Sequence, residues 1–152
     1  LLFMGCEFAQ RRPWSHHHQL DWELLDDDDG PHAGVARLVA DLNAAYRALP
    51  ALWQRDVDDG GIDWIEADDL AGGVYAFARR GDDGLPLVCI ANLGAQARDC
   101  GDLALPPAAG WRVVLDSCSV RYGGAGDGGG DPPGCRPPLS CVWLEPLETK
   151  DG

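Results

Sequence analysis

The sequence predicts an α+β chain in which an N-terminal strand, loop and helix (residues 1–56) precede an all-β sandwich domain (residues 57–152). An apolar run opens the chain, and a single stretch within its first third has helical periodicity. Beyond it, short apolar runs alternate with turn residues, as in an antiparallel sheet domain. With 152 residues and 45% hydrophobic composition, the chain can bury a core of its own.

The apolar run Leu1–Met4 is typical of a short strand buried on both faces of a parallel sheet, and Gly5 ends it. Because the chain begins inside this run, at Leu1, we expect it to be a piece of a longer protein. The following segment, residues 7–31, is too polar for a core and too aromatic for a spacer. Long ordered loops of this kind are often functional.

A helix is predicted from about Ala33 to Leu49. Apolar residues recur there at three- and four-residue steps and give one apolar face: Val35, Leu38, Val39, Leu42, Tyr46 and Leu49. Pro50 marks the end, since proline disfavours helical geometry in the residue before it. A short turn is expected at residues 51–55.

The turn sequence Asp58-Asp59-Gly60-Gly61 begins the β domain. We predict strands near residues 62–66, 74–80, 87–93, 102–105, 111–116 and 139–144. Both faces of the 87–93 strand are largely apolar, which indicates a central strand. Residues 123–134 contain seven glycines and two prolines, so a mobile loop is expected there.

The charge balance excludes several classes of partner. Twenty-five acidic against twelve basic side chains give a formal charge of −13, which repels phosphate backbones and anionic lipid headgroups. No apolar run approaches the roughly 20 residues of a membrane helix. We therefore expect a cytoplasmic protein that binds neither nucleic acid nor membrane.

The six cysteines contain no Cys-x-x-Cys spacing of a zinc or redox site. Reduced, structural thiols are favoured, because a chain without a secretion signal belongs to a reducing compartment. A bridge from Cys118 to Cys135 or Cys141 is the alternative.

Four residues of the long loop are candidates for binding a substrate: Glu7, Gln10, Trp14 and Trp22. Glu7 and Gln10 follow the C-terminal end of the predicted strand, and in (β/α)8 barrels this rim carries the substrate site. The alternative for Glu7 is a local one, in which it accepts hydrogen bonds from loop backbone. The two tryptophans can stack on sugar rings or pack beneath the loop.

Two polar runs in this loop invite a metal interpretation that their spacing disfavours. In His16-His17-His18, adjacent residues of an extended loop point in different directions, and no fourth ligand stands at metal-site spacing. The run Asp26–Asp29 lacks the distributed ligands of a calcium loop. We predict solvated loops, with no metal and no cofactor.

The segment from Leu1 to Gln10 resembles the eighth barrel strand and following turn of 1,4-alpha-glucan branching enzymes of the alpha-amylase superfamily. The resemblance continues in family order over nearly the whole chain, through Trp14, His16, Leu20-Asp21-Trp22, Leu24-Leu25, His32, Gly34-Val35, Asp41-Leu42-Asn43, Tyr46-Arg47, Pro50-Ala51-Leu52, Trp64-Ile65, Asp68-Asp69, Phe77, Arg79-Arg80, Asn92, Tyr122-Gly123-Gly124 and Trp143-Leu144-Glu145-Pro146.

This resemblance implies that residues 1–56 are the end of a (β/α)8 barrel, namely its last strand, active-site loop and final helix. It also implies a parent enzyme that cuts α-1,4 glucan chains and transfers the segment to a 6-hydroxyl, forming α-1,6 branches in glycogen. The partners would be an α-glucan, glycogen or amylose, and the missing N-terminal barrel portion. The family's catalytic carboxylates come from earlier barrel strands, so no catalytic residue is assigned here and the fragment is expected to be inactive.

The sequence departs from the family in two places. The family commonly has Trp-Asn-His-Asp where this chain has Trp14-Ser15-His16-His17. It also has an alternating strand before the final Pro-Pro-Leu, whereas here the glycine-rich loop leads almost directly into Pro137-Pro138-Leu139. The other function left open is a noncatalytic, glucan-binding or structural β-sandwich module.

Overall fold

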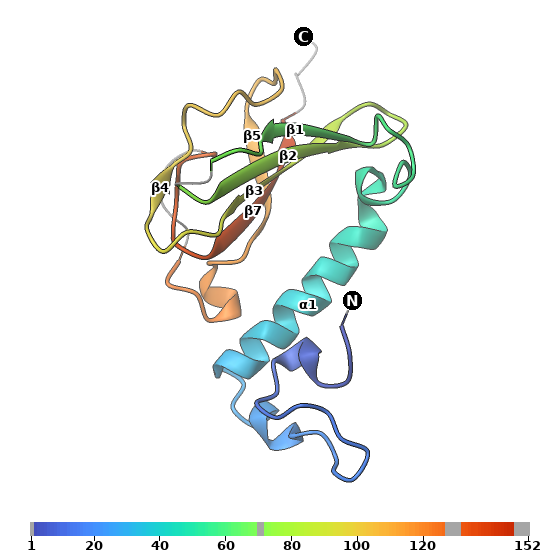
Figure 1. The fold of residues 1–152 in the computed structure, drawn as a ribbon, viewed down its shortest axis with the longest axis vertical. Helices are drawn as coiled ribbons and strands as arrows, with labels where there is room; N and C mark the ends of the chain where they lie inside the picture. Colours follow the sequence, from blue (N-terminus) through green and yellow to red (C-terminus); the bar gives the residue numbers. More distant parts are fainter. Residues whose placement is uncertain (1, 70–71, 127–131, 148–152) are drawn as a thin grey trace.

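The computed structural model describes residues 2–69, 72–126 and 132–147. An irregular N-terminal segment leads into one long helix, α1, and the helix leads into an antiparallel β domain (Figure 1). The N-terminal segment lies beside α1 and away from the large sheet.

The predicted first strand is wrong for residues 2–4, and Leu1 lies outside the described residues. Leu2 and Phe3 have no regular structure, and Met4 and Gly5 form a turn in which the amide of Cys6 donates to the carbonyl of Phe3 at 3.0 Å. A strand needs a neighbour to satisfy its backbone groups, and no other strand runs beside this segment within the described residues. A 3-10 turn, η1 (Cys6–Phe8), follows the segment.

The predicted helix is confirmed as α1 (Pro31–Ala48). Pro31 occupies the first turn, where its missing amide hydrogen costs nothing. The helix ends before Pro50, and a 3-10 turn, η3 (Pro50–Leu52), follows as the sequence predicted. An earlier turn, η2 (Trp22–Leu25), lies in the long loop.

The main sheet has five antiparallel strands in the order β1-β2-β3-β7-β5. All five were predicted within two residues: β1 (Ile62–Glu66), β2 (Val74–Arg80), β3 (Pro86–Asn92), β5 (Trp111–Asp116) and β7 (Ser140–Pro146). The 87–93 segment is confirmed as the central strand, because β3 pairs with β2 on one side and β7 on the other.

A second, small sheet pairs β4 (Arg98–Asp99) with β6 (Cys135–Arg136). The predicted strand at residues 102–105 is wrong, because this segment crosses the face of the large sheet, where Leu103 and Leu105 pack against its buried side chains. Strand β6 directly precedes Pro137, at a position where the sequence indicated no strand. Residues 127–131 of the predicted mobile loop lie outside the described residues.

The hydrophobic core lies on one face of the large sheet. It contains Val74, Ala76, Ala78, Val88, Ile90, Cys100, Val142 and Leu144. Two polar groups tie the covering segments to this core. Arg136 donates to Asp116 at 2.7 Å in a buried ion pair, and the buried amide of Asn92 donates to the carbonyls of Gln96 and Pro137 at 2.8 and 2.9 Å.

Helix α1 contacts the β domain mainly at a further 3-10 turn, η4 (Val120–Tyr122). The carboxylate of Asp41 accepts hydrogen bonds from the Arg121 guanidinium and the Tyr122 hydroxyl, both at 2.8 Å. Gly34 lets the helix come so close that a Cβ there would lie 2.3 Å from the Tyr122 carbonyl oxygen. Residues about 80 positions apart thus hold the two parts together.

The remaining apolar face of α1 is poorly covered. Only Ala33 and Gly34 of the helix are buried, whereas Val35, Leu38, Val39 and Leu42 are half-buried. Tyr46 is 49% exposed. An apolar helix stripe normally faces a core, so this face has the character of a surface that packs against further protein.

Replacing Gly34 by alanine tests the helix contact. In an open helix this change would stabilise the fold by about 1 kcal/mol. Here the new methyl group meets backbone of Tyr122, so we expect a net loss of about 1–3 kcal/mol in the free energy of unfolding. Ala40→Gly, on the exposed side of α1, is the control for helix propensity alone. Urea denaturation of both variants decides the question, and a more stable Gly34→Ala protein would show that the contact is absent.

Candidate functional site

The four candidate residues all lie in the loop between Gly5 and α1, but the structure uses them differently. Glu7 is engaged locally: its Oε2 accepts a hydrogen bond of 2.8 Å from the amide of Gly5. The hydrogen-bonding alternative drawn from the sequence is therefore seen in the structure. Gly5 itself has a φ of 90°, a conformation suited to glycine.

Gln10 lies at the centre of this loop. Its amide donates to the carbonyl of Gly5 at 3.0 Å, and its Nε2 donates to the carbonyl of Arg12 at 2.8 Å. Its side-chain oxygen Oε1 is buried and has no hydrogen-bond partner in the structure. A buried, unpaired oxygen is unfavourable, and a donor from a ligand or another chain would satisfy it.

Trp14 and Gln10 line the same hollow, of about 260 Å³, together with Phe3, Met4, Cys6, Arg11, Arg12 and Pro13. The Trp14 ring meets Phe3 edge-on, with ring centroids 5.3 Å apart, and remains 43% exposed. An accessible indole face beside amide and guanidinium groups is suited to a flat, hydroxyl-rich ligand.

Trp22 belongs to another part of the loop. Its ring packs on Phe8 with centroids 5.4 Å apart, and Phe8 is itself 1% exposed. Trp22 keeps 51% of its surface exposed, but it does not line the hollow beside Trp14. The structure thus brings Gln10 and Trp14 together and leaves Trp22 apart.

Two interactions that hold the loop were not predicted from the sequence. Arg12 Nε lies 3.1 and 3.2 Å from the two carboxylate oxygens of Asp21, which is 6% exposed. The hydrogen bond from Arg12 lowers the pKa of Asp21 below its ordinary value. Nδ1 of His32 in α1 lies 2.9 Å from the Phe8 carbonyl oxygen and so fixes the start of the loop to the helix. These partners are nine and twenty-four residues apart in the sequence, so no local sequence pattern indicates either interaction.

The histidine run lies in a turn of the loop. The rings of His16 and His17 lie 3.8 Å apart, and the His17 amide donates to Ser15 Oγ at 3.3 Å. In the part of the chain that the structure describes, no group of three or more His, Cys, Asp or Glu side chains is placed to hold a metal ion. In the aspartate run, the Asp29 amide donates to Asp27 Oδ1 at 3.2 Å, as in an Asx turn.

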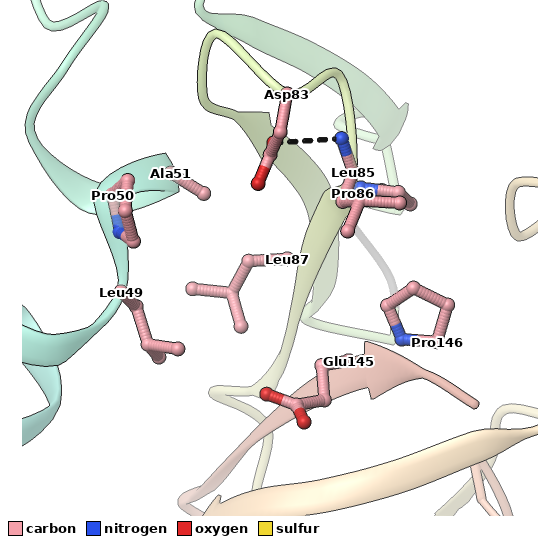
Figure 2. Close-up of a pocket in the computed structure, with 9 residues that line it drawn as sticks. All are labelled: Leu49, Pro50, Ala51, Asp83, Leu85, Pro86, Leu87, Glu145 and Pro146. Carbon is pink, nitrogen blue, oxygen red and sulfur yellow. Dashed lines mark hydrogen bonds between the residues drawn. The ribbon is translucent and has the colours of Figure 1, made fainter. Parts of the chain in front are cut away.

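A second hollow, of about 180 Å³, lies between η3, which follows α1, and the strands β3 and β7 of the large sheet. Figure 2 shows η3 on one side, Leu87 projecting between, and the carboxylates of Asp83 and Glu145 at the margins. Asp83 already accepts from the Leu85 amide at 2.9 Å, and Glu145 pairs with Arg112. The walls of this second hollow are mostly leucine and proline side chains, which favours packing over binding of a polar ligand.

Among the helices of the described residues, none is long and apolar enough to cross a membrane.

Comparison with known proteins places the chain in a family. The sequence profile described as "Alpha amylase, C-terminal all-beta domain" matches residues 64–146. In a solved structure, a Salmonella typhimurium protein assigned as an alpha amylase superimposes with a TM-score of 0.51 at 14% identity, over 84% of this chain and 18% of that one. At this identity the likeness supports the fold alone.

The similar sequences include three proteins named 1,4-alpha-glucan branching enzyme GlgB. Those of Frankia casuarinae and Streptomyces coelicolor are 41% and 42% identical, each over 96% of this chain, and one of Mycobacterium bovis is 44% identical over the same share. The chain covers 20%, 21% and 22% of these proteins, or about a fifth of their length.

The antiparallel β domain matches the family profile, and the sequence likeness extends through the loop and α1 to nearly the whole chain. The chain therefore belongs to the alpha-amylase family of C-terminal all-beta domains and is homologous to the C-terminal part of the 1,4-alpha-glucan branching enzymes.

Proposed function

We propose that this chain is the C-terminal part of a cytoplasmic 1,4-alpha-glucan branching enzyme, which cleaves α-1,4 glucan chains and re-attaches the released segment as an α-1,6 branch. The observation that carries the proposal is the identity of 41–42% to two such enzymes over 96% of the chain. The match includes the loop and α1 as well as the β domain. Glycogen or amylose would be the substrate of the intact enzyme.

In this proposal residues 1–56 complete a (β/α)8 barrel, and residues 57–152 form an all-β sandwich domain attached to it. The uncovered face of α1 supports this division, because a final barrel helix packs its apolar stripe against the barrel. Leu2, Phe3 and Met4 are 54%, 57% and 52% exposed, which also fits apolar side chains that pack against the preceding part. The missing barrel portion is therefore the first partner of this chain.

The chemistry of branching requires two carboxyl groups. In a retaining glycosidase site, one attacks the anomeric carbon while the other protonates the leaving oxygen, and they stand roughly 5–5.5 Å apart. We assign neither role to Glu7, because its carboxylate already holds the Gly5 amide. The nucleophile and the acid/base would come from the preceding barrel strands, and this chain would supply part of the substrate path.

We place Gln10 and Trp14 on that path, with Glu7 fixing the loop and Trp22 at its outer margin. The open face of Trp14 can stack on a glucose ring, and Gln10 lines the same hollow. Asp21 and Arg12 would act indirectly by holding the loop in shape.

A noncatalytic glucan-binding or structural module is the second candidate. The β domain favours it in one respect, because its core is built from its own strands and from the segment that crosses them. The reading frame upstream distinguishes the candidates: barrel strands that carry the missing carboxylates identify an enzyme, whereas an independent start codon identifies a module.

Trp14→Ala tests the proposed path in the intact parent enzyme. We expect kcat/KM with amylose to fall by about tenfold, since a lost stacking contact costs roughly one to two kcal/mol, while the melting temperature changes little. Trp53→Ala is a matched control, because Trp53 is equally exposed, at 43%, but lies beside Tyr46 and Arg47 at the end of α1. Unchanged kinetics together with a large loss of melting temperature would identify Trp14 as a packing residue.

The isolated chain should have no branching activity. Without a nucleophile and an acid/base there is no covalent glycosyl intermediate, and the large rate enhancement has no source. The purified chain is incubated with amylose while iodine colour and new α-1,6 anomeric proton signals are followed by NMR. Signals above those of a heat-killed control would show that the catalytic residues lie within residues 1–152.

A further inference from the structure

Two cysteine thiols meet on the large sheet, away from the loop that carries the candidate site. Cys89 of β3 and Cys141 of β7 have their sulfur atoms 3.5 Å apart, within hydrogen-bond distance. In the strand register Cys89 lies opposite Trp143 and Cys141 lies opposite Ala91, so the two thiols are diagonal neighbours on adjacent strands. The bond length of a disulfide is about 2.05 Å, so the sulfurs need to approach by only about 1.5 Å.

Both thiols lie on the face of the sheet opposite its core. Val88 and Ile90 flank Cys89 and are buried, as are Ser140 and Val142 beside Cys141, whereas both cysteines are half-buried. Neither cysteine is therefore part of the fully buried core. This sets the pair apart from Cys100, which is buried, and from Cys6 and Cys135, which are exposed but have no sulfur–sulfur hydrogen bond in the described structure.

The pair is also chemically asymmetric. The hydrogen bond from Cys89 lowers the pKa of Cys141, and the Trp143 side chain adds to this effect. The same contact with Cys141, together with burial, raises the pKa of Cys89. Cys141 is thus the thiol that ionises first, and a thiolate is the nucleophilic form of cysteine.

We propose that Cys89 and Cys141 form a peroxide-oxidisable dithiol that closes to a disulfide between β3 and β7. The Cys141 thiolate attacks one oxygen of a hydroperoxide; the O–O bond breaks, and the sulfur becomes a sulfenic acid while hydroxide leaves and is protonated to water. Cys89 then attacks the Cys141 sulfur, the S–O bond breaks, and the departing oxygen leaves as a second water with the Cys89 proton. Two thiols and one hydrogen peroxide give one disulfide and two waters.

A disulfide between Cys89 and Cys141 would connect two strands in the middle of the large sheet. β3 is the central strand, and β7 joins it to β5, so the crosslink would tie together the middle of the sheet (Figure 1). Diagonal cross-strand neighbours are farther apart than directly opposite residues, which favours a bond that a dithiol reductant reopens easily. The site therefore has the properties of a reversible modification rather than of a permanent staple.

Peroxide titration of the whole chain tests the proposal. The reduced protein, freed of reductant, is treated with hydrogen peroxide, and its free thiols are counted in denaturant under nonreducing conditions. We expect the count to fall from six to four, and nonreducing peptide mapping to find Cys89 joined to Cys141. Dithiothreitol should restore all six thiols. The same treatment in strong denaturant is the control, because pairing there should be unselective.

Single variants separate the two roles. With Cys89→Ser, sulfenic acid should persist on Cys141 and be trapped by dimedone, because no resolving thiol stands beside it. With Cys141→Ser, peroxide treatment should form no disulfide at Cys89, because the partner thiol 3.5 Å away is absent. Cys118→Ser should leave the bond unchanged. A folded wild-type chain that keeps six thiols, or that joins Cys118 to Cys135 or to Cys141, would overturn the proposal whether or not the variants fold.

Discussion

The docking of α1 on the corner at Val120–Tyr122 is the contact on which the arrangement of the two parts depends. The carboxylate of Asp41 accepts from Arg121 and Tyr122, and these hydrogen bonds lower the pKa of Asp41, so the contact is made with the ionised acid. Gly34 permits the close approach one and a half to two turns earlier in the helix. His32 of the same helix contacts the carbonyl oxygen of Phe8 and so holds the loop to α1. The docking of α1 therefore also sets the position of the candidate site relative to the sheet.

The two parts differ in how completely they bury their apolar surface. The sheet places Ala76, Val88 and Ile90 in a core where each is 0% exposed. The helix buries only its start, and each large apolar side chain left in water forgoes roughly 1.5–3 kcal/mol. A few such losses rival the whole net stability of a domain, about 5–15 kcal/mol. We therefore expect the β domain to be the more stable of the two parts and the loop and helix to be held less firmly.

Sequence reasoning succeeded where the pattern is local. Strand periodicity and turn residues predicted all five strands of the large sheet, and proline and the helical repeat predicted α1. It failed where tertiary partners decide the structure. Residues 2–4 have the composition of a strand, but no strand of the described residues lies beside them, and Leu103 and Leu105 cover the core without joining a sheet. Within the candidate site, position along the chain made Gln10 and Trp14 candidates, but no local sequence pattern indicated the Arg12–Asp21 pair that holds their loop.

Amide hydrogen exchange measured residue by residue tests most directly whether the helix is held less firmly than the sheet. The amides of β2, β3 and β7 should exchange only through global unfolding of the β domain, whereas those of α1 from Val35 to Tyr46 should exchange through an opening of lower free energy. Addition of the preceding part of a branching enzyme should then protect α1 selectively. Equal protection of α1 and β3 in the isolated chain would contradict this, because the helix and the sheet would then be one cooperative unit that needs no further partner.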